Sequence, residues 1–185
     1  MTDPTTSPGS GRTGSSGRTG NSGQTGKWSF EVVSRTSAPV DRVWPLLGEA
    51  ERWKEWSFLD RSDLVRPGDP APDGVGAVRR FTRFGIGSRE EVVLWDPPHH
   101  LGYIILKGIP VRRYRADITL TPDGSGTANG SGAVNGSGTL ICWRASFDTL
   151  LPGSGHLMVA VLKTVIGRFA RGVARYAETL PGTPS

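Results

Sequence analysis

The amino-acid sequence predicts an α+β fold in which a curved antiparallel sheet of about six or seven strands surrounds a long C-terminal helix. Runs of alternating apolar and polar residues succeed one another through the middle of the chain, and turns rich in Gly and Pro separate them. Strands with such short connections pair antiparallel. The last run has apolar residues three and four positions apart, which is typical of a helix that packs one face against a sheet.

The bulk composition excludes several functional classes. The chain has 185 residues, a formal net charge of +5 and a single cysteine, Cys142. No intrachain disulfide can form, and the His, Cys and acidic residues lack metal-ligand spacing, so we expect no metal and no cofactor. We expect no nucleic-acid partner, because the aromatic residues belong to the predicted core. A cytoplasmic location fits the absence of disulfides.

Two segments of low complexity stand apart from the rest of the chain. Residues 1–26 contain no Leu, Ile, Val, Phe, Trp or Tyr and repeat a hexapeptide pattern, so we predict a disordered tail. Residues 124–138 are rich in Gly and Ser and lie between two strand-like runs. We interpret them as a hairpin insertion, since lengthening a surface loop costs little free energy. Residues 27–181 form one predicted domain.

The first predicted strand, Trp28–Thr36, leads into two short helices. The first helix begins near Pro39, with Ser37 or Asp41 as its N-cap. The second covers Glu49–Trp56. The later strands are predicted at Arg61–Arg66, Gly76–Phe84, Ser88–Trp95, Leu101–Lys107, Arg112–Thr121 and Thr139–Phe147.

The long helix covers His156–Leu180 and ends at Pro181-Gly182. Its apolar face comprises Met158, Val161, Leu162, Val165, Ile166, Phe169, Val173 and Tyr176. Strand alternation identifies the sheet residues that should meet this face. These are Tyr114, Ala116, Ile118 and Leu120 on one strand, and Ile141, Trp143, Ala145 and Phe147 on the last.

Several short motifs occur in an order that resembles a known family. They are the strand-to-helix passage Val33–Trp44, the segment ERWKEW, the turn Gly74-Val75-Gly76, the strand end Asp96-Pro97-Pro98, and the Gly138-Thr139 start of the last strand with Trp143 at its middle. Together they resemble the START-like superfamily (SRPBCC), which includes the polyketide cyclase/dehydrase and lipid-transport family. The resemblance implies a helix-grip fold with a ligand cavity between the sheet and the long helix.

The function that this resemblance implies is binding of a small hydrophobic ligand, such as a lipid, an isoprenoid or a polyketide-like molecule. One alternative is an enzyme, a polyketide cyclase, dehydratase or aromatase that acts on the ligand in the cavity. Another is a quinone or lipid chaperone that docks on a membrane or a protein partner. The sequence has no fixed catalytic motif, so it leaves the choice between binding protein and enzyme open, and it makes no prediction of the oligomeric state.

The candidate ligand-binding residues are apolar or aromatic side chains on the inward faces. They are Phe81, Tyr103, Ile105, Tyr114, Ile118, Ile141, Trp143, Met158, Leu162, Val165 and Phe169. Arg79, Tyr103 and Tyr114 are the candidates for catalysis, because a phenol hydroxyl or a guanidinium can orient a polar group of the ligand.

Two groups of basic residues have alternative interpretations, one on a strand and one on the long helix. Alternation places Arg79 on the same face as Phe81 and Arg83. We favour the solvated convex face for the arginines of this strand. An inward arginine would need an anionic ligand or a carboxylate partner, which Glu90 or Glu91 could supply. On the long helix, the spacing of Arg168, Arg171 and Arg175 would permit a weak contact with an anionic membrane surface.

Overall fold

The computed structural model describes residues 26–124 and 138–181. Within them, the elements follow the order β1 (Trp28–Thr36), α1 (Val40–Gly48), η1 (Ala50–Arg52), α2 (Trp53–Trp56), β2 (Arg61–Arg66), β3 (Val78–Arg83), β4 (Ile86–Asp96), β5 (His100–Lys107), β6 (Val111–Asp123), β7 (Gly138–Thr149) and α3 (Gly155–Thr179). The predicted tail and most of the predicted insertion lie outside the described residues.

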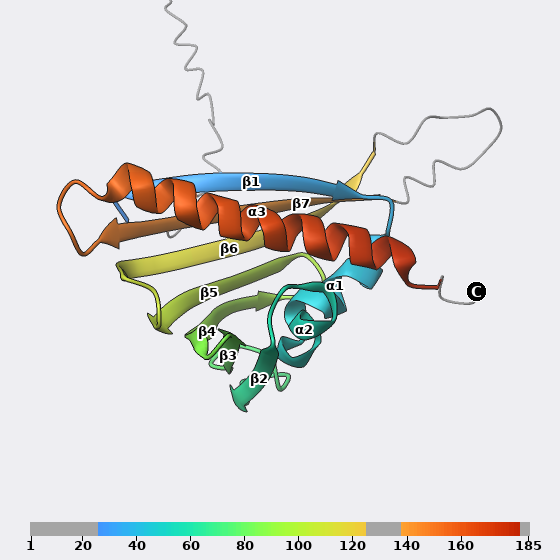
Figure 1. Cartoon of the computed structure of the whole chain (residues 1–185). Coiled ribbons are helices and arrows are strands. Elements are labelled where there is room, and N and C mark those ends of the chain that lie inside the picture. The colour runs from blue at the N-terminus through green and yellow to red at the C-terminus, as the bar shows by residue number, and fades with distance from the viewer. Residues whose placement is uncertain (1–25, 125–137, 182–185) are drawn as a thin grey trace, which may run out of the picture.

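The seven strands form one sheet in the order β1-β7-β6-β5-β4-β3-β2, and every neighbouring pair is antiparallel. The sheet curves, and α3 runs along its concave side while α1 and α2 cover the end below the second half of α3 (Figure 1). This arrangement confirms the predicted α+β fold, a helix-grip with a curved antiparallel sheet and short helices after the first strand.

The predicted inward faces of β6 and β7 are confirmed. Tyr114, Ala116, Ile118 and Leu120 are all buried, and so are Ile141, Trp143, Ala145 and Phe147. On α3 the prediction is wrong for Val161, which is 48% exposed. Leu157, one turn earlier, is 67% exposed, so this side of α3 faces solvent and Val161 lies outside the buried stripe.

The N-cap prediction for α1 is also wrong. Pro39 occupies the N-cap and makes no side-chain capping bond. Ser37 is instead held by a hydrogen bond from its backbone N–H to Glu178 near the end of α3, at 3.0 Å. Pro39 has no N–H of its own and its fixed φ suits the start of a helix, so α1 begins without a side-chain cap.

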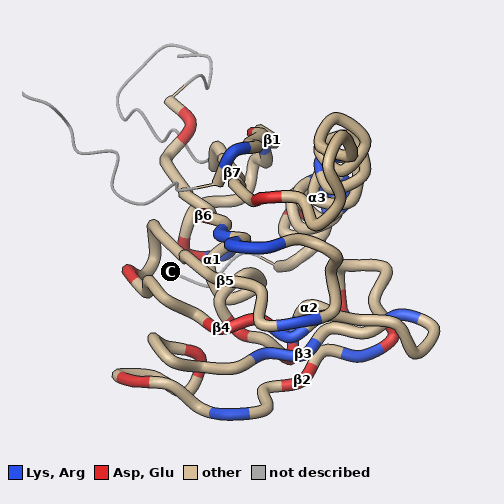
Figure 2. Tube along the Cα trace, turned by 90° about the vertical axis from the view of Figure 1, so that its left-hand side faces the viewer, with Lys and Arg blue, Asp and Glu red and all other residues tan. Residues whose placement is uncertain are grey.

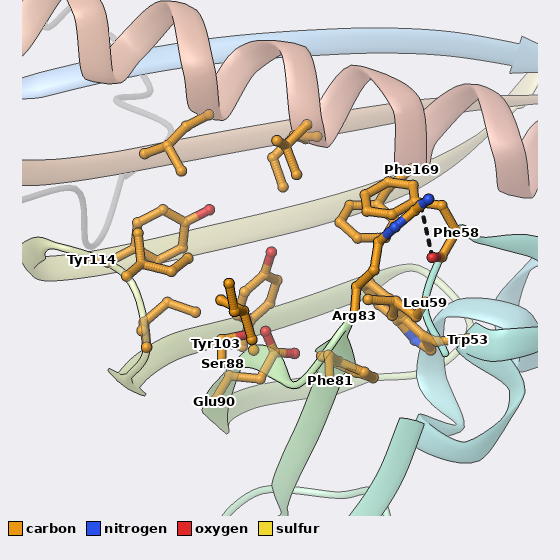
Figure 3. A pocket seen from close by; sticks show the side chains of 18 of the residues that line it. Trp53, Phe58, Leu59, Phe81, Arg83, Ser88, Glu90, Tyr103, Tyr114 and Phe169 are labelled. Carbon is orange, nitrogen blue, oxygen red and sulfur yellow. Dashed lines mark hydrogen bonds between the residues drawn. The ribbon is translucent and has the colours of Figure 1, made fainter. Parts of the chain in front are cut away.

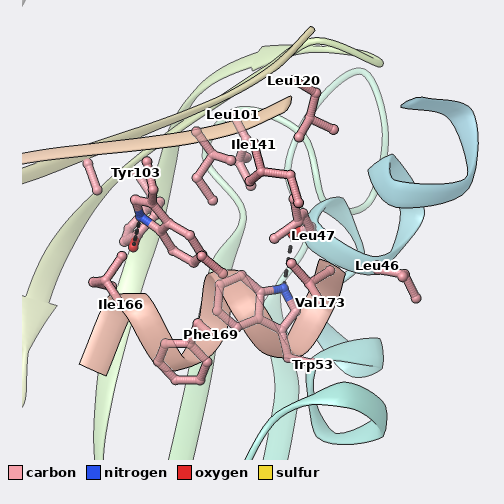
Figure 4. Packing of buried hydrophobic residues seen from close by; sticks show 14 of the residues in the cluster. Leu46, Leu47, Trp53, Leu101, Tyr103, Leu120, Ile141, Ile166, Phe169 and Val173 are labelled. Atoms are coloured by element: carbon pink, nitrogen blue, oxygen red, sulfur yellow. Dashed lines mark hydrogen bonds between the residues drawn. The ribbon is translucent and has the colours of Figure 1, made fainter. Parts of the chain in front are cut away.

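Trp53 is the centre of the hydrophobic core (Figure 4). Its ring stacks on Phe81 at 4.5 Å and meets Trp143 and Phe169 edge-on at 5.8 and 5.6 Å between ring centroids. Its indole N–H donates to the Leu47 carbonyl at 2.9 Å, so the polar atom of this buried ring has a partner. One tryptophan thereby joins α1, the sheet and α3.

Hydrogen bonds fasten the end of α3 to the end of β1. The Thr36 hydroxyl donates to the Ala174 carbonyl at 2.9 Å, and the Glu178 carboxylate accepts from Ser37. The hydrogen bond from the Ser37 backbone lowers the pKa of Glu178 below its ordinary value of 4.5. The carboxylate therefore stabilises the fold above that pH, and the contribution is lost as the pH falls through the lowered pKa.

We expect Glu178→Gln to lower the melting temperature at neutral pH, because the amide cannot supply the charge that strengthens the bond from Ser37. The difference from the wild-type chain should shrink as the pH falls through the lowered pKa of Glu178, where the native carboxyl becomes protonated. Calorimetry at several pH values measures this. Glu49→Gln is the control, since the exposed Glu49 side chain makes no hydrogen bond or ion pair with the described residues. A difference that does not change with pH would contradict the assignment.

Candidate functional site

A cavity of about 240 Å³ lies between the concave face of the sheet and α3. Its walls come from the α2–β2 segment, from β3 to β7 and from the first half of α3 (Figure 3). The lining residues are Trp53, Phe58, Leu59, Phe81, Arg83, Ile86, Gly87, Ser88, Glu90, Tyr103, Ile105, Gly108, Ile109, Tyr114, Trp143, Leu162, Val165, Ile166 and Phe169. Most of the lining is aliphatic or aromatic, as is typical of small-molecule sites.

The cavity has an open side and a closed side. Ile86, Gly87 and Gly108 are exposed and belong to the tips of the β3–β4 and β5–β6 hairpins, so these tips form the mouth. At the closed side, the floor contains the buried polar side chains of Glu90, Tyr103 and Tyr114. The polar groups of the lining are thus buried, whereas the hairpin tips are exposed.

Glycines permit the close approach of the two hairpins at the mouth. Gly108 has a φ of +106°, which side chains other than glycine rarely adopt, and a Cβ atom there would collide with the Gly87 carbonyl. A Cβ atom on Gly87 would in turn collide with the Phe81 carbonyl. The mouth therefore depends on two positions without side chains.

A buried ion pair lies directly behind the floor. Arg79 has no exposed surface, and its Nη2 donates to Glu90 Oε1. The pairing of β3 with β4 places the two residues opposite each other in the sheet. The prediction that the arginine lies on the solvated convex face is therefore wrong for Arg79, and the alternative carboxylate partner, Glu90, is confirmed. The face that carries Phe81 must turn inward, and Arg79 lies on that face.

Arg79 also binds the end of α1. Its Nη1 donates to the Leu47 carbonyl at 3.2 Å, and Gly48 offers a second carbonyl at 3.5 Å. The last carbonyls of a helix lack partners within the helix and carry partial negative charge, so a cation is stabilised there. The rings of Trp53, Phe81 and Tyr103 lie 5.3–5.5 Å from the guanidinium carbon.

Burial changes the acidity of the floor groups. It raises the pKa of the Glu90 carboxyl, and the positive charge and hydrogen bond of Arg79 oppose that rise. Because arginine stays charged and a fully buried cation requires a counter-charge, we assign Glu90 as ionised in its pair with Arg79. Burial also raises the pKa of the Tyr103 and Tyr114 hydroxyls, and the nearby Glu90 charge adds to the rise. Both phenols therefore carry their protons at neutral pH.

Irregularities in strand pairing occur beside the polar floor residues. The β4–β5 register shifts between Arg89 and Glu90, and the β6–β7 register shifts between Arg112 and Arg115 on either side of Tyr114. Arg113, inside the second shift, has a φ of +49°. A bulge of this kind re-aims side chains next to functional sites. The sheet is thus irregular where Glu90 and Tyr114 turn into the cavity.

The sequence-predicted ligand residues fall into two groups. Eight of them line the cavity, namely Phe81, Tyr103, Ile105, Tyr114, Trp143, Leu162, Val165 and Phe169. Ile118 and Ile141 are fully buried in the core away from it, and Met158 packs against the core from the start of α3. Of the candidates for catalysis, Tyr103 and Tyr114 reach the cavity, whereas Arg79 does not line it.

Sequence reasoning did not assign Glu90 to the cavity, although a signal was present. Ser88, Glu90 and Val92 alternate on one face of β4, and Val92 is fully buried. Glu90 is thus a charged residue on a face that must turn inward. Phe58 and Leu59 were missed for another reason, because they lie in the irregular segment after α2, where no periodicity indicates which way a side chain points.

Comparison with known proteins identifies the family. The family described as "Polyketide cyclase / dehydrase and lipid transport" matches residues 27–178. The chain belongs to this family. Its match spans every described strand and nearly all of α3, and the family and fold are consistent with binding of a hydrophobic ligand. None of the curated proteins compared with the chain matches it.

Solved structures share the fold at low sequence identity. A START superfamily protein from Mycobacterium smegmatis is 11% identical with a TM-score of 0.64, over 83% of this chain and 99% of that one. A protein from Thermobifida fusca is 22% identical with a TM-score of 0.61, over 81% and 91% of the two chains. The protein XoxI from Bacillus cereus is 13% identical with a TM-score of 0.63, over 82% and 96%. At these identities the likeness establishes the fold alone.

The described part of the chain lacks two structural features. Residues 26–124 and 138–181 contain no helix with the length and apolarity needed to cross a bilayer. The same residues contain no group of three or more His, Cys, Asp or Glu side chains arranged to hold a metal ion.

The ion pair behind the floor gives a prediction about stability. We expect Glu90→Leu to reduce the free energy of unfolding by about 3–5 kcal/mol, because it leaves the Arg79 charge buried without a counter-charge. The double variant R79M/E90L should recover most of this loss, since it removes both charges and fills the space with apolar groups. Urea unfolding of the wild-type chain, the two single variants and the double variant measures the coupling. If the losses in unfolding free energy of the two single variants add up to that of the double variant, Arg79 and Glu90 are not energetically coupled.

Proposed function

We propose that this protein reversibly binds a small hydrophobic molecule in the cavity between the sheet and α3. The observation that carries the proposal is an apolar cavity of about 240 Å³ with an open mouth and a polar floor. An engineered cavity of about 150 Å³ holds benzene, and drug-sized ligands occupy about 300–1,000 Å³. The volume therefore suits a molecule of about two fused rings, or the end of a longer isoprenoid or polyketide-like chain.

The first test blocks the cavity from α3. Val165 lines the cavity, whereas Val161, one turn earlier, does not line it and is 48% exposed. We expect Val165→Trp to weaken binding of naphthalene at least about tenfold, because the indole occupies the space of the ligand. Val161→Trp should leave binding unchanged. Quenching of the cavity tryptophans, Trp53 and Trp143, or isothermal titration calorimetry measures the affinity.

Native mass spectrometry of the purified protein complements this titration, because it detects any ligand that co-purifies. Binding of naphthalene that is equally strong in both tryptophan variants would overturn the proposed location.

An enzymatic role is the second candidate. Glu90 and the two tyrosine hydroxyls favour it, since they place groups that accept or donate protons in an apolar cavity. A ligand that leaves the cavity with an altered structure would support the enzyme.

A membrane contact at the mouth is a third proposal, and the β3–β4 hairpin favours it. Phe84 and Ile86 are both 78% exposed. Phe84 has a φ of +50° in a turn position where Asn or Gly is usual, so the turn itself gives no reason for an aromatic residue. We infer that these side chains insert into the surface of an anionic bilayer when the ligand is exchanged.

The charges around the mouth suit an anionic surface. The guanidinium of Arg83 lies 4.8 Å from the Phe84 ring, and that of Arg168 lies 4.8 Å from the Phe58 ring. Figure 2 shows basic positions along α3. The helix also contains Arg171 and Arg175, and Glu178 is its one acidic residue. Basic residues beside exposed apolar ones are typical of proteins that bind a membrane surface.

We expect the double variant F84S/I86S to lower affinity for vesicles of phosphatidylcholine and phosphatidylglycerol at least about tenfold. The variant has lost the two apolar side chains whose transfer from water into the bilayer would stabilise the bound state. The control V65S/V75S removes exposed apolar side chains outside the cavity lining and should bind as the wild-type chain does. Charge reversal of Arg168, Arg171 and Arg175 should abolish the salt-sensitive part of binding. Vesicle sedimentation measures both effects. No binding by the wild-type chain would overturn this proposal and leave the cavity proposal intact.

A further inference from the structure

The polar groups of the cavity floor form a set with a definite hydrogen-bonding character. Glu90, Tyr103 and Tyr114 are buried and line the same cavity, and the rings of the two tyrosines lie 6.2 Å apart (Figure 3). The rest of the buried lining is apolar. The floor is therefore the place where a ligand would have to satisfy polar groups, and its chemistry selects the part of the ligand that arrives there.

Glu90 offers an acceptor to that position. Its Oε1 accepts from Arg79, while its Oε2 has no hydrogen bond from the described residues. Among the described residues, the fully buried side-chain atoms without a partner are Arg79 Nε and Ser146 Oγ, so Glu90 Oε2 keeps a little accessible surface, and a donor supplied by a ligand can reach it. A ligand hydroxyl can supply that donor without bringing a charge into the cavity.

The tyrosines supply the complementary group. The Tyr103 hydroxyl accepts a hydrogen bond from the Trp143 indole N–H at 3.2 Å, and it also interacts with the Tyr114 hydroxyl. When Tyr103 donates to Tyr114, the proton of Tyr114 is left to donate to a ligand. Tyr114 also lines the cavity, and its hydroxyl is the second protonated phenol of the floor. A ligand hydroxyl can donate to Glu90 and accept from a tyrosine, as a hydroxyl combines one donor with two acceptor lone pairs.

The charges at the floor favour binding of neither an anionic nor a cationic head group. Arg79 does not line the cavity, and its two terminal nitrogens are engaged with Glu90 and the end of α1. An anionic head would therefore face the Glu90 carboxylate without an available cation. A cationic head would gain little, since Arg79 already balances the charge of Glu90. The cation in the lining is Arg83, which lies toward the mouth and donates to the Phe58 carbonyl at 2.9 Å.

We propose that the cavity selects ligands with a neutral hydroxyl or phenol group at one end, which enters first, donates to Glu90 Oε2 and accepts from Tyr103 or Tyr114. This inference rests on the proposed binding function and names the class of ligand. It makes Glu90 the residue that determines specificity. A free carboxylic acid of the same shape is rejected at neutral pH.

Three probes that share one ring system test the head group directly. They are 1-naphthol, 1-methoxynaphthalene, which lacks the donor, and 1-naphthoate, which is anionic. By isothermal titration calorimetry at neutral pH, we expect 1-naphthol to bind about tenfold tighter than 1-methoxynaphthalene, as befits a hydrogen bond to a charged group. Binding of 1-naphthoate should be the weakest of the three.

Variants assign the preference to the floor. R79M/E90L removes the acceptor together with the buried cation, so we expect 1-naphthol and 1-methoxynaphthalene to bind within about threefold of each other. Tyr114→Phe keeps the ion pair and the Glu90 acceptor, so 1-naphthol should still bind more tightly than 1-methoxynaphthalene, although both probes lose a tyrosine donor to their oxygen. Tyr176→Phe is the matched control, because the Tyr176 hydroxyl bonds to Glu55 outside the cavity, at 3.3 Å.

The outcomes separate this inference from the proposed function. If the two neutral probes bind equally to the wild-type chain, the head-group inference fails and the apolar binding function stands. If 1-naphthoate binds tightest and Arg83→Gln abolishes that preference, the head group stays at the mouth and the inference is overturned. If no probe binds, the proposed function itself fails.

Discussion

The ion pair between Arg79 and Glu90 is the interaction on which the rest of the structure depends. It joins β3 to β4, and through the Leu47 carbonyl it holds the end of α1 against the sheet. The same carbonyl accepts from Trp53, whose ring contacts Phe169 of α3. A cation with no exposed surface is tolerable because a carboxylate, helix carbonyls and three aromatic rings surround it.

The cavity exists because α3 packs closely along only part of its length. In its second half, the small residues Ala170, Ala174 and Ala177 are buried and let the helix approach the sheet, and Glu178 fastens that end to β1. In its first half, Leu162, Val165 and Ile166 lie over open space. Small side chains bring a helix close and large ones hold it away, so the sequence of α3 sets where the core is solid and where it is hollow.

Period-two and helical spacing sufficed to predict the elements, their order and most inward faces, because burial on one side imposes those periods directly. Of the polar floor, alternation identified Tyr103 and Tyr114 but not Glu90. The alternation of β3 places Arg79 and Phe81 on one face, yet the partner of Arg79 depends on the register with β4, which no local pattern reveals. The shift in register around Tyr114 and the positive φ of Arg113 likewise have no signal in a regular strand pattern.

The size of the cavity constrains what its polar floor can do. At about 240 Å³ it admits roughly two fused rings beside Glu90, so a larger lipid would leave most of its length at the mouth. The mouth is built from hairpin tips, with glycines at the points of closest approach. The ion pair lies away from these tips, because Arg79 and Glu90 pair with each other several residues before the β3–β4 turn. The chemistry that distinguishes one end of a ligand is therefore separate from the surface that its other end would meet at the mouth.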